Sequence, residues 1–407
     1  MHGQLTAVSE PGAAMVAAAE RHALEFRLGA MANDASATFA VDHLDKLRAD
    51  RFLVATVPAG LGGGGVTSVH DLLVAASRLA RTDAATAIGV NMHFAVVHNF
   101  VRAWSVAVER WDERTAERMS DLLRLVAATD TVFAAAVSEP APQNLLQPGT
   151  VAARVADGWS VSGTKVFATM AQHATVLSVA VTFPGGRGDA RYGFAAIPAA
   201  SPGVVFHDDW DALGMRASAS GSVSFDDVRV PDAMLADTCP AGVWTAELMD
   251  RYLVSGALHA AASLGIAEGA YAEVLGRLGA RSASAGDLYV IAELSAAAVD
   301  VAAMQATLGR AGARLDEYFA VHRMGDATRA DAQRVTGVVQ AAKAFLNAAS
   351  VRVVDRALAL SGGAGYRAGD PLAKAWRDVR AGSFMHPTGA NRVSTFLART
   401  ALGMDLE

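Results

Sequence analysis

Cysteine, aromatic side chains and charge are all scarce in this chain of 407 residues. Cys239 is its one cysteine, so no disulfide can form within the chain. Hydrophobic residues make up 52% and charged residues 19%, a balance that excludes a disordered protein and suffices for a large buried core. Aromatic residues make up 7%, and segments rich in Ala, Leu, Arg and Glu outnumber those rich in Val, Ile and Thr. A small disulfide scaffold, a collagen-like chain and a wholly β protein are therefore excluded.

Basic runs and metal-binding patterns are also missing. The chain has 35 Lys and Arg against 41 Asp and Glu, a net charge of −6, and Lys itself is rare. Proteins that bind nucleic acid usually carry a basic patch, so we expect no nucleic-acid partner. The chain has no His-Glu-x-x-His segment and no cluster of Cys and His, so we expect no metal site.

Targeting and membrane segments are not evident either. Residues 1–14 lack the basic start and apolar run of a signal peptide. The longest stretch without charge lies between Lys165 and Arg187, and its Thr, Gln, His, Pro and Gly indicate buried strands instead of a membrane span. Cys239 lies among turn-forming residues, where we expect a linker and an unreactive thiol. We therefore expect a cytoplasmic enzyme or binding protein that does not enter a membrane.

Three zones of different texture follow one another along the chain. The length predicts two to three domains at about 150 residues each. Residues 1–129 have helical periodicity, residues 130–237 have short Val- and Thr-rich segments, and residues 238–407 are again helical and rich in Ala. We predict an α+β protein with an N-terminal helical domain, a middle antiparallel β-barrel or sandwich, and a C-terminal four-helix bundle.

In the first zone, apolar residues at helical spacing predict a helix over Val69–Ala80 that Ser68 caps, and a second helix over Ala85–Trp104. The glycine run Gly62–Gly65 precedes the first of these helices. It is interpreted either as a mobile connection or as a loop that closes over a substrate or a flavin.

The second zone predicts a compact β domain of about seven strands. The turn residues Ala156–Trp159 predict a hairpin between two of them. The expected strands are Val132–Val137, Thr150–Val155, Trp159–Gly163, Thr175–Thr182, Tyr192–Ile197, Val204–His207 and Ser222–Val230.

The third zone predicts an antiparallel bundle of four helices. The glycines after Ser361 would end the third helix, and Pro371 would begin the fourth. The expected helices are Trp244–Leu278, Asp287–Phe319, Arg329–Leu360 and Pro371–Ala381.

Four local motifs occur in one order along this layout. Together they resemble the acyl-CoA dehydrogenase superfamily over nearly the whole chain, although each alone is a weak signal. They are Phe133–Pro140 (Phe-Ala-Ala-Ala-Val-Ser-Glu-Pro), Gly163–Thr169 (Gly-Thr-Lys-Val-Phe-Ala-Thr), Leu213–Pro231, and Ser361–Tyr366 with the later Pro371–Leu372 and Arg377–Asp378.

The resemblance implies a flavin site. An isoalloxazine ring is a flat, mostly apolar disc with polar edges, so it needs an apolar wall and a few hydrogen-bond donors. By analogy with the family, Phe167 would flank the ring, and Ser138 and Thr169 would bond its pyrimidine edge and N5. Alone, either hydroxyl could equally be satisfied by backbone at a strand end.

The same resemblance adds candidates near the C-terminus. The backbone of Gly362, Gly363 and Gly365 could approach the ribityl or phosphate part of the flavin, although a helix C-cap explains these glycines equally well. Thr388 is a further flavin-binding candidate.

Several family features are absent. The family's catalytic Glu is replaced by His386 when the spacing is counted from Arg377, and the family's other base position falls on Ser255, downstream of Asp250. The turn that helps to hold acyl-CoA reads Ala141–Gln147 and lacks the usual Gly and Ser. The family's Arg-x-x-Phe-Gly, which grips the FAD pyrophosphate, is replaced by residues 281–286.

These losses fit the two-component flavin monooxygenases of the superfamily. Such enzymes take reduced FMN or FAD from a separate reductase and react it with O2 in a dry pocket. They resemble this chain in having a His at the lost Glu position, here His386, and a second His on an N-terminal helix, for which His93 is our candidate. Thr169 would take the place of the N5-side Ser. We expect His98 to be structural and His207 to lie on the surface.

We therefore expect a flavin-dependent monooxygenase that hydroxylates carbon or nitrogen of a small substrate and assembles as a homotetramer. One alternative is an FAD-dependent dehydrogenase or oxidase of acyl-CoA or acyl-carrier thioesters, with a base elsewhere. A second alternative is an inactive homologue that acts as a scaffold.

Overall fold

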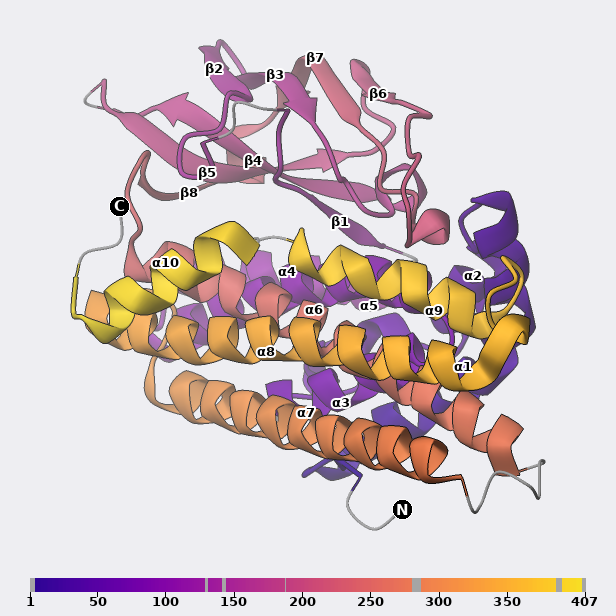
Figure 1. Ribbon diagram of the computed structural model, residues 1–407. Helices are drawn as coiled ribbons and strands as arrows, with labels where there is room; N and C mark the ends of the chain where they lie inside the picture. Colours follow the sequence, from indigo (N-terminus) through magenta and orange to yellow (C-terminus); the bar gives the residue numbers. More distant parts are fainter. Residues whose placement is uncertain are drawn as a thin grey trace.

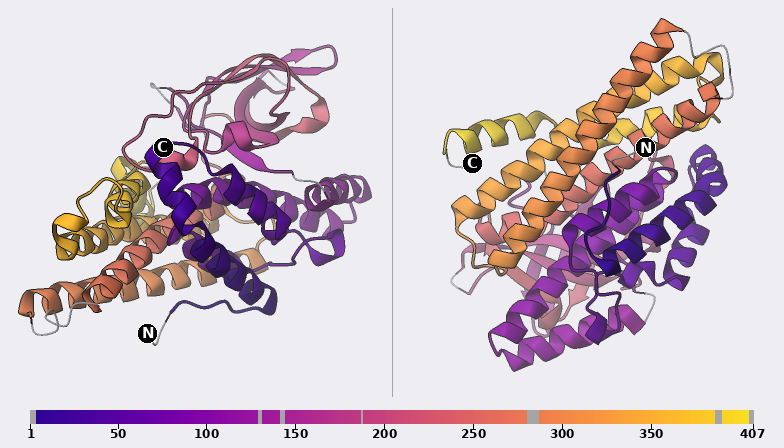
Figure 2. Two further views of the ribbon diagram at one scale, coloured as in Figure 1. Left: turned by 90° about the vertical axis from the view of Figure 1, so that its right-hand side faces the viewer. Right: turned by 90° about the horizontal axis from the view of Figure 1, so that it is seen from below.

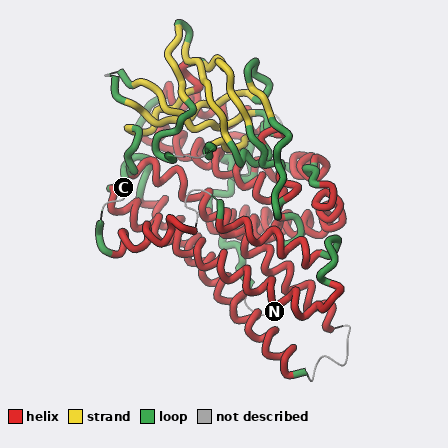
Figure 3. Tube along the Cα trace, turned by 45° about the horizontal axis from the view of Figure 1, so that its top comes forward, coloured by secondary structure: helices red, strands yellow, loops and turns green. Residues whose placement is uncertain are grey.

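The computed structural model describes residues 4–128, 131–140, 144–186, 188–279, 287–385 and 390–404. A sheet of eight strands lies above a thick layer of helices, as Figure 1 shows from the front and Figure 3 shows by secondary structure. The helices come from both ends of the chain and the sheet from its middle, which confirms the predicted fold class.

The N-terminal part is helical. Its helices are α1 (Glu10–Ser36), α2 (Val41–Ala49), α3 (Val69–Ala80), α4 (Ala84–Glu109) and α5 (Glu113–Ala128). The Ser68 hydroxyl accepts a hydrogen bond from the N–H of Asp71 and so caps α3, as the sequence predicts. Asp83 caps α4 in the same way through the N–H of Thr86. Both helices are buried along most of their length because they pack against elements on several sides.

The glycine run Gly62–Gly65 packs as backbone against the segment that precedes it. The N–H groups of Gly64 and Gly65 donate to the carbonyls of Val54 and Val57. A Cβ atom on Gly63 would lie 2.1 Å from the Val57 carbonyl oxygen. Close backbone packing therefore accounts for these glycines, and they lie outside the wall of the cavity described below.

The sheet has the strand order β6-β7-β3-β2-β4-β5-β8, with β1 beside β4. Its strands are β1 (Phe133–Ala136), β2 (Val151–Val155), β3 (Gly158–Lys165), β4 (Val176–Pro184), β5 (Ala190–Pro198), β6 (Val204–Phe206), β7 (Val223–Val230) and β8 (Leu235–Pro240). The hairpin predicted at Ala156–Trp159 joins β2 and β3, where Val155 pairs with Gly158. Strand β1 runs parallel to β4, so the sheet is not antiparallel throughout.

Strand β8 corrects the expectation that Cys239 lies in a linker. Cys239 pairs with Tyr192 of β5, and its side chain is buried in a small cluster with Tyr252. Burial raises the pKa of the thiol above its ordinary value. The sheet therefore extends to Pro240, beyond the predicted limit at residue 237, and the expectation of an unreactive thiol acquires a physical basis.

The C-terminal part is helical again. Its helices are α6 (Ala246–Gly279), α7 (Leu288–Val321), α8 (Arg329–Ser361), α9 (Pro371–Asp378) and α10 (Ala390–Ala401). The fourth predicted helix is shorter than expected, because after Asp378 the chain tightens into a 3-10 turn. Helix α10 was not predicted.

Helix α6 is the centre of the molecule. It packs against α8 and α7 on one side and against α3 and α4 on the other. Seen from below in Figure 2, the indigo and purple N-terminal helices lie beside the orange C-terminal ones. One continuous hydrophobic core therefore joins the helices of both ends to the inner face of the sheet.

Helix α7 lies on the outside of this layer. Among the described residues it is the one helix that is long and apolar enough to cross a membrane, by length and composition alone. Only 17% of its most apolar window is buried, and it packs against α8, α3 and α6. A lone helix of this kind is weak evidence for a membrane span.

Candidate functional site

A cavity of about 920 Å³ opens between the sheet and the helices. Small-molecule sites typically measure about 300–1000 Å³, so this cavity is large. Residues of α4, α5, β1, β4, β5, α6 and α9 line it, and its wall is mostly apolar, with Met92, Phe133 and Phe194 among the larger side chains.

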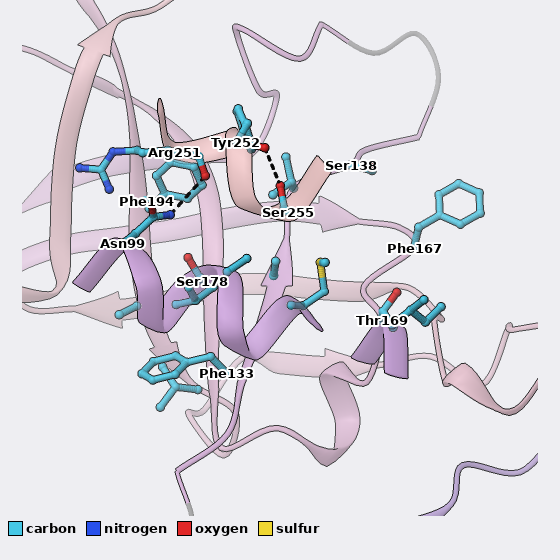
Figure 4. Close-up of a pocket in the computed structure, with 18 of the residues that line it drawn as sticks. Asn99, Phe133, Ser138, Phe167, Thr169, Ser178, Phe194, Arg251, Tyr252 and Ser255 are labelled. Carbon is cyan, nitrogen blue, oxygen red and sulfur yellow. Dashed lines mark hydrogen bonds between the residues drawn. The ribbon is translucent and has the colours of Figure 1, made fainter. Parts of the chain in front are cut away.

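Three of the predicted flavin-binding residues line this cavity together. They are Ser138, Phe167 and Thr169. In Figure 4, Phe167 and Thr169 lie at one end of the cavity, Arg251 and Phe194 lie at the other end, and Ser138 lies between. The cavity therefore has a hydroxyl-bearing end and an end that carries a cationic side chain.

A buried ion pair holds the first two family motifs together. The side chain of Lys165, at the end of β3, is fully buried, and its Nζ lies 2.7 Å from Oε1 of Glu139. Glu139 also accepts hydrogen bonds from the N–H groups of Gly149 and Thr150. Burial lowers the pKa of Lys165 to about 8. Burial alone would raise the pKa of Glu139, but the hydrogen bond and charge of Lys165, together with the hydrogen bonds from Thr150 and Gly149, outweigh burial, and the pKa is lowered.

This ion pair positions the hydroxyl end of the cavity. Glu139 directly follows Ser138, and Lys165 lies two residues before Phe167. The N–H of Val166 also donates to the Ser138 carbonyl oxygen over 2.9 Å. The co-occurrence of the two motifs thus has a structural reason, since each supplies one partner of a buried pair.

The Thr169 hydroxyl belongs to a chain of hydroxyl groups. Ser220 Oγ donates to Thr169 Oγ1 over 2.9 Å, and Ser218 Oγ lies 2.6 Å from Ser220 Oγ. Because Thr169 accepts from Ser220, its own proton is available to a ligand in the cavity. Sequence reasoning had not singled out Ser218 and Ser220, although both belong to the third motif.

The backbone around these hydroxyls is strained. Phe167, Met170, Met215 and Ala219 all have positive φ, between 46° and 62°, without being glycine. Such residues persist only where the surrounding contacts impose them, and they cluster at functional sites.

The fourth family motif, at Arg377–Asp378, holds the turn at Gly214–Met215 in place. Asp378 Oδ1 accepts a hydrogen bond of 2.6 Å from the N–H of Met215, and Lys374 Nζ lies 2.5 Å from Asp378 Oδ2. A Cβ atom on Gly214 would lie 2.2 Å from the carbonyl oxygen of Arg377. The third and fourth motifs are therefore in direct contact, which joins α9 to the cavity wall.

The charged groups in the cavity wall are all basic. Among the described residues that line the cavity, Arg118, Arg251, Arg377 and Arg380 carry positive charge, and none is Asp or Glu. Three of these arginines also pair with carboxylates outside the lining, which partly offset their charge: Arg251 with Glu247, Arg377 with Asp34 and Arg380 with Asp355. Guanidinium groups bind phosphate well, and the described lining presents no carboxylate that would repel an anionic ligand. It also lacks a carboxylate that could remove a proton from a thioester.

The second family position for a catalytic base, on α6, carries no carboxylate toward the cavity. Ser255 lines the cavity, and its hydroxyl donates to the Tyr252 carbonyl oxygen. Asp250 lies elsewhere, buried against Arg102 and Tyr318.

The structure places His93 apart from the cavity wall. Its ring is fully buried, Nε2 donates to the Leu53 carbonyl oxygen over 2.9 Å, and Nδ1 accepts from the N–H of Phe133 over 3.1 Å. Burial lowers the pKa of His93 to about 4. Both ring nitrogens are therefore used in joining α4 to neighbouring backbone, which gives His93 a structural role in place of the expected catalytic one.

The other two histidines have the roles expected of them. His98 is half-buried outside the described cavity wall, and His207 contacts Ser224 at the surface.

The predicted glycines are absent from the described cavity lining, whereas Phe384 and Met385, just before His386, belong to it. Gly362 has a φ of 66° and ends α8, and the N–H of Gly365 donates to the Gly362 carbonyl oxygen. Together with Gly363 they form a helix C-terminus and a 3-10 turn, which agrees with the alternative interpretation. His386, Thr388 and residues 281–286 lie outside the described residues.

His259 is a cavity residue that sequence reasoning missed. It lies on α6 four residues after Ser255 and seven after Tyr252, so all three share one helix face, and all three line the cavity. That spacing from Ser255 is the signal that could have identified it.

Comparisons with known proteins agree with this geometry. Two family models match: "Acyl-CoA dehydrogenase, middle domain" over residues 134–228 and "Acyl-CoA dehydrogenase, C-terminal domain" over residues 257–386. The amino sugar nitrososynthase RubN8 of Streptomyces rubradiris is 33% identical over 416 residues, covering 98% of this chain and 92% of the relative. The probable FMNH2-dependent monooxygenase SfnC of Pseudomonas putida is 27% identical over 360 residues, covering 84% of each chain.

A solved structure is also closely similar. KijD3 in complex with FMN and dTDP-3-amino-2,3,6-trideoxy-4-keto-3-methyl-D-glucose superposes with a TM-score of 0.90 at 29% identity. The match covers 98% of this chain and 96% of that one.

Proposed function

Because this chain belongs to the acyl-CoA dehydrogenase superfamily, within its flavin-dependent monooxygenase branch, we propose that it N-oxygenates an amino sugar carried on a nucleoside diphosphate. The chain is a flavin-dependent oxidoreductase that uses FMN. The identity of the substrate is the new element of the proposal, and it draws on the nitrososynthases among the relatives.

The observation that carries the proposal is the charge of the cavity wall. Its described lining has four arginines and no carboxylate. An acyl-CoA dehydrogenase of this family needs a Glu base at the substrate, so the wall argues against the dehydrogenase alternative. A nucleoside diphosphate is anionic and matches guanidinium groups in both charge and geometry.

The hydroxyl end of the cavity fits a flavin. Thr169 has a proton to donate, Ser138 supplies a second hydroxyl, and Phe167 and Trp210 supply aromatic surface at ring centroids 6.1 Å apart. When bound, reduced FMN supplies the two electrons that activate O2. The residues of this chain orient the ring and exclude water from it.

The opposite end fits the nucleotide. Arg251, from α6, lies at this end together with Asn99, whose amide donates to the Arg251 carbonyl oxygen. Arg118, from α5, also lines the cavity. We propose that the two arginines contact the diphosphate, which would place the sugar toward the middle of the cavity and its amine toward the flavin.

The proposed reaction balances in two turnovers. In the first, the amine, O2 and reduced FMN give the hydroxylamine, water and oxidised FMN. In the second, the hydroxylamine, O2 and reduced FMN give the nitroso sugar, two waters and oxidised FMN. O2 is the oxidant, and no proton is removed from carbon, in keeping with a wall without a carboxylate base.

The test supplies purified protein with FMN, a flavin reductase with its nicotinamide donor, O2 and a dTDP-linked 3-amino sugar. Mass spectrometry is expected to detect the hydroxylamine and then the nitroso sugar. The proposal fails if reduced FMN is reoxidised without any N-oxygenated product, above all if an acyl thioester bleaches the bound flavin in the absence of O2.

A matched pair of arginine variants localises the nucleotide. Arg251→Met is expected to raise the KM for the nucleotide sugar about tenfold or more, because a hydrogen bond to a charged group contributes roughly 1.5–3 kcal/mol. Arg154→Met removes an exposed arginine of β2 that lies outside the cavity wall and should leave KM unchanged.

We further propose that the enzyme works in the cytoplasm as a homotetramer and receives reduced FMN from a separate reductase. Support for assembly comes from α7, where Leu288, Val299 and Val321 are apolar and exposed. Light scattering on the purified protein tests the tetramer. For the reductase, product should form with an added reductase and not with nicotinamide donor and FMN alone.

A further inference from the structure

A basic pair lies where α6 faces α8. The ring of His259, on α6, is 8% exposed and lines the cavity. Lys343, on α8, is 2% exposed, and its Nζ donates to the Met385 carbonyl oxygen over 2.5 Å. Met385 itself lines the cavity, so both basic groups belong to one region of its wall.

His259 differs from the other buried histidines. In the described part of the chain neither of its ring nitrogens makes a hydrogen bond, and Nδ1 is buried. His93 uses both nitrogens. His22 and His98 also have buried ring nitrogens without a hydrogen-bond partner, but they lie outside the described cavity wall, which His259 lines. Nε2 is not among the buried atoms and makes no hydrogen bond in the described part of the chain, so it is the ring nitrogen that a ligand in the cavity can reach.

Burial and the neighbouring positive charge keep the His259 imidazole neutral. Burial first, and then the charge of Lys343, lower the pKa of His259 to about 3. Burial also lowers the pKa of Lys343 to about 7. The described cavity lining has no carboxylate to offset these groups, so a positively charged ligand atom is disfavoured beside His259.

A neutral amine is the ligand group that fits these conditions. Neutral imidazole has one nitrogen that accepts a hydrogen bond, and an uncharged amine has N–H groups to donate. The amine lone pair stays free, and it is this lone pair that must receive oxygen in N-oxygenation. An ammonium group has no lone pair and would meet the field of Lys343.

We propose that His259 recognises the amino group of the substrate, by accepting a hydrogen bond from its N–H at a ring nitrogen on the cavity wall. The inference rests on the proposed function, because it requires an amine in this cavity. His259 would then be the residue that makes the cavity prefer a sugar with an uncharged amino group over a sugar without an amino group.

The test measures binding by calorimetry to protein loaded with oxidised FMN. The two probes are a dTDP-linked 3-amino sugar and its 3-deoxy analogue. Wild type is expected to bind the amino sugar more tightly than the analogue. His259→Leu should reduce that ratio about 3- to 10-fold, as expected for the loss of one hydrogen bond of about 0.5–1.5 kcal/mol, and leave binding of the analogue unchanged.

His98→Leu is the matched control. It removes the imidazole of a half-buried residue outside the described cavity wall, whose pKa is also lowered to about 3, and it should keep the wild-type ratio. If circular dichroism shows that His259→Leu does not fold, His259→Asn replaces it, since Asn is polar but too short to reach as far as imidazole, and the same loss is expected.

The outcomes separate the two proposals. If wild type binds and oxygenates the amino sugar while both His259 variants keep the ratio, the inference about His259 is wrong and the proposed function stands. If wild type binds no nucleotide-linked amino sugar, the proposed function is wrong and the inference is overturned with it.

Discussion

The buried pair of Glu139 and Lys165 offers the sharpest test of how this site is held together. The variant Glu139→Gln keeps the shape but leaves the Lys165 ammonium without a counter-charge. It also keeps only one acceptor oxygen, whereas the N–H groups of Gly149 and Thr150 donate to different oxygens of Glu139, so one of these hydrogen bonds is lost as well. The Lys165 side chain is 0% exposed and that of Glu139 is 10% exposed. Removing one partner of a buried pair typically costs about 3–5 kcal/mol.

We therefore expect Glu139→Gln to lower the free energy of unfolding by about 3 kcal/mol, measured by urea denaturation followed by circular dichroism. The double variant Glu139→Gln, Lys165→Met also removes the unpaired ammonium group and should recover part of the lost free energy of unfolding. Asp121→Asn is the control, because it breaks an exposed pair with Arg124 and should cost less than about 1 kcal/mol. A loss for Glu139→Gln as small as that of the control would refute the argument.

The pH dependence follows from the direction of the shift. The pKa of Glu139 is lowered in the folded protein from its ordinary value of 4.5. Its ionised form therefore adds stability above about pH 4.5, and this contribution is lost as the pH falls through the folded pKa. The difference between wild type and Glu139→Gln should be complete at neutral pH and should narrow in acid. A difference that stays constant down to pH 3 would contradict the assignment.

Three further predictions concern the cavity wall and the cysteine. Gly214→Ala should lower the free energy of unfolding by about 1–3 kcal/mol and weaken FMN binding, because its Cβ would lie 2.2 Å from the Arg377 carbonyl oxygen. Thermal unfolding and a fluorescence titration with FMN measure the two effects, and an unchanged Tm and Kd would contradict the prediction. Thr169→Val should weaken FMN binding about 2- to 10-fold by removing one donor and depriving Ser220 of its acceptor; an unchanged Kd would refute the role of that hydroxyl. Cys239 should react with iodoacetamide far more slowly in native than in urea-unfolded protein, since burial raises the pKa of its thiol; equal rates would contradict its placement in β8.

Most of the secondary structure could be predicted from local pattern. The cap at Ser68, the hairpin at Ala156–Trp159 and the three long C-terminal helices all depend on residues close in sequence. Strand β8 could not be predicted in this way, because Leu235–Pro240 contains Asp and Pro and is held as a strand by its pairing with β5. Helix α9 ended early for a similar reason, since Asp378 is engaged by the turn at Met215.

The candidate site could be predicted in part. Ser138, Phe167 and Thr169 were found from motifs, and the structure brings them to one cavity. The role of His93 could not be judged from its helix alone, because its two partners belong to a 3-10 turn and a strand far away in the chain. His259 was missed because its spacing from Ser255 is informative only once Ser255 is known to line a cavity, and a long Ala-rich helix does not by itself indicate which face does so.

Composition and periodicity were thus enough to predict the three-part fold of this chain, since it depends on local hydrogen bonding, capping and apolar patterning. The superfamily and the flavin chemistry were predicted from the resemblance that four motifs in one order bear to a known family. The charge of the cavity wall, the use of both His93 nitrogens and the exposure of His259 depended on contacts between α4, α6, α8 and β1. Burial and hydrogen bonding between distant segments decide which polar groups are already satisfied and which are left for a ligand, and that accounting exists only once the chain is folded.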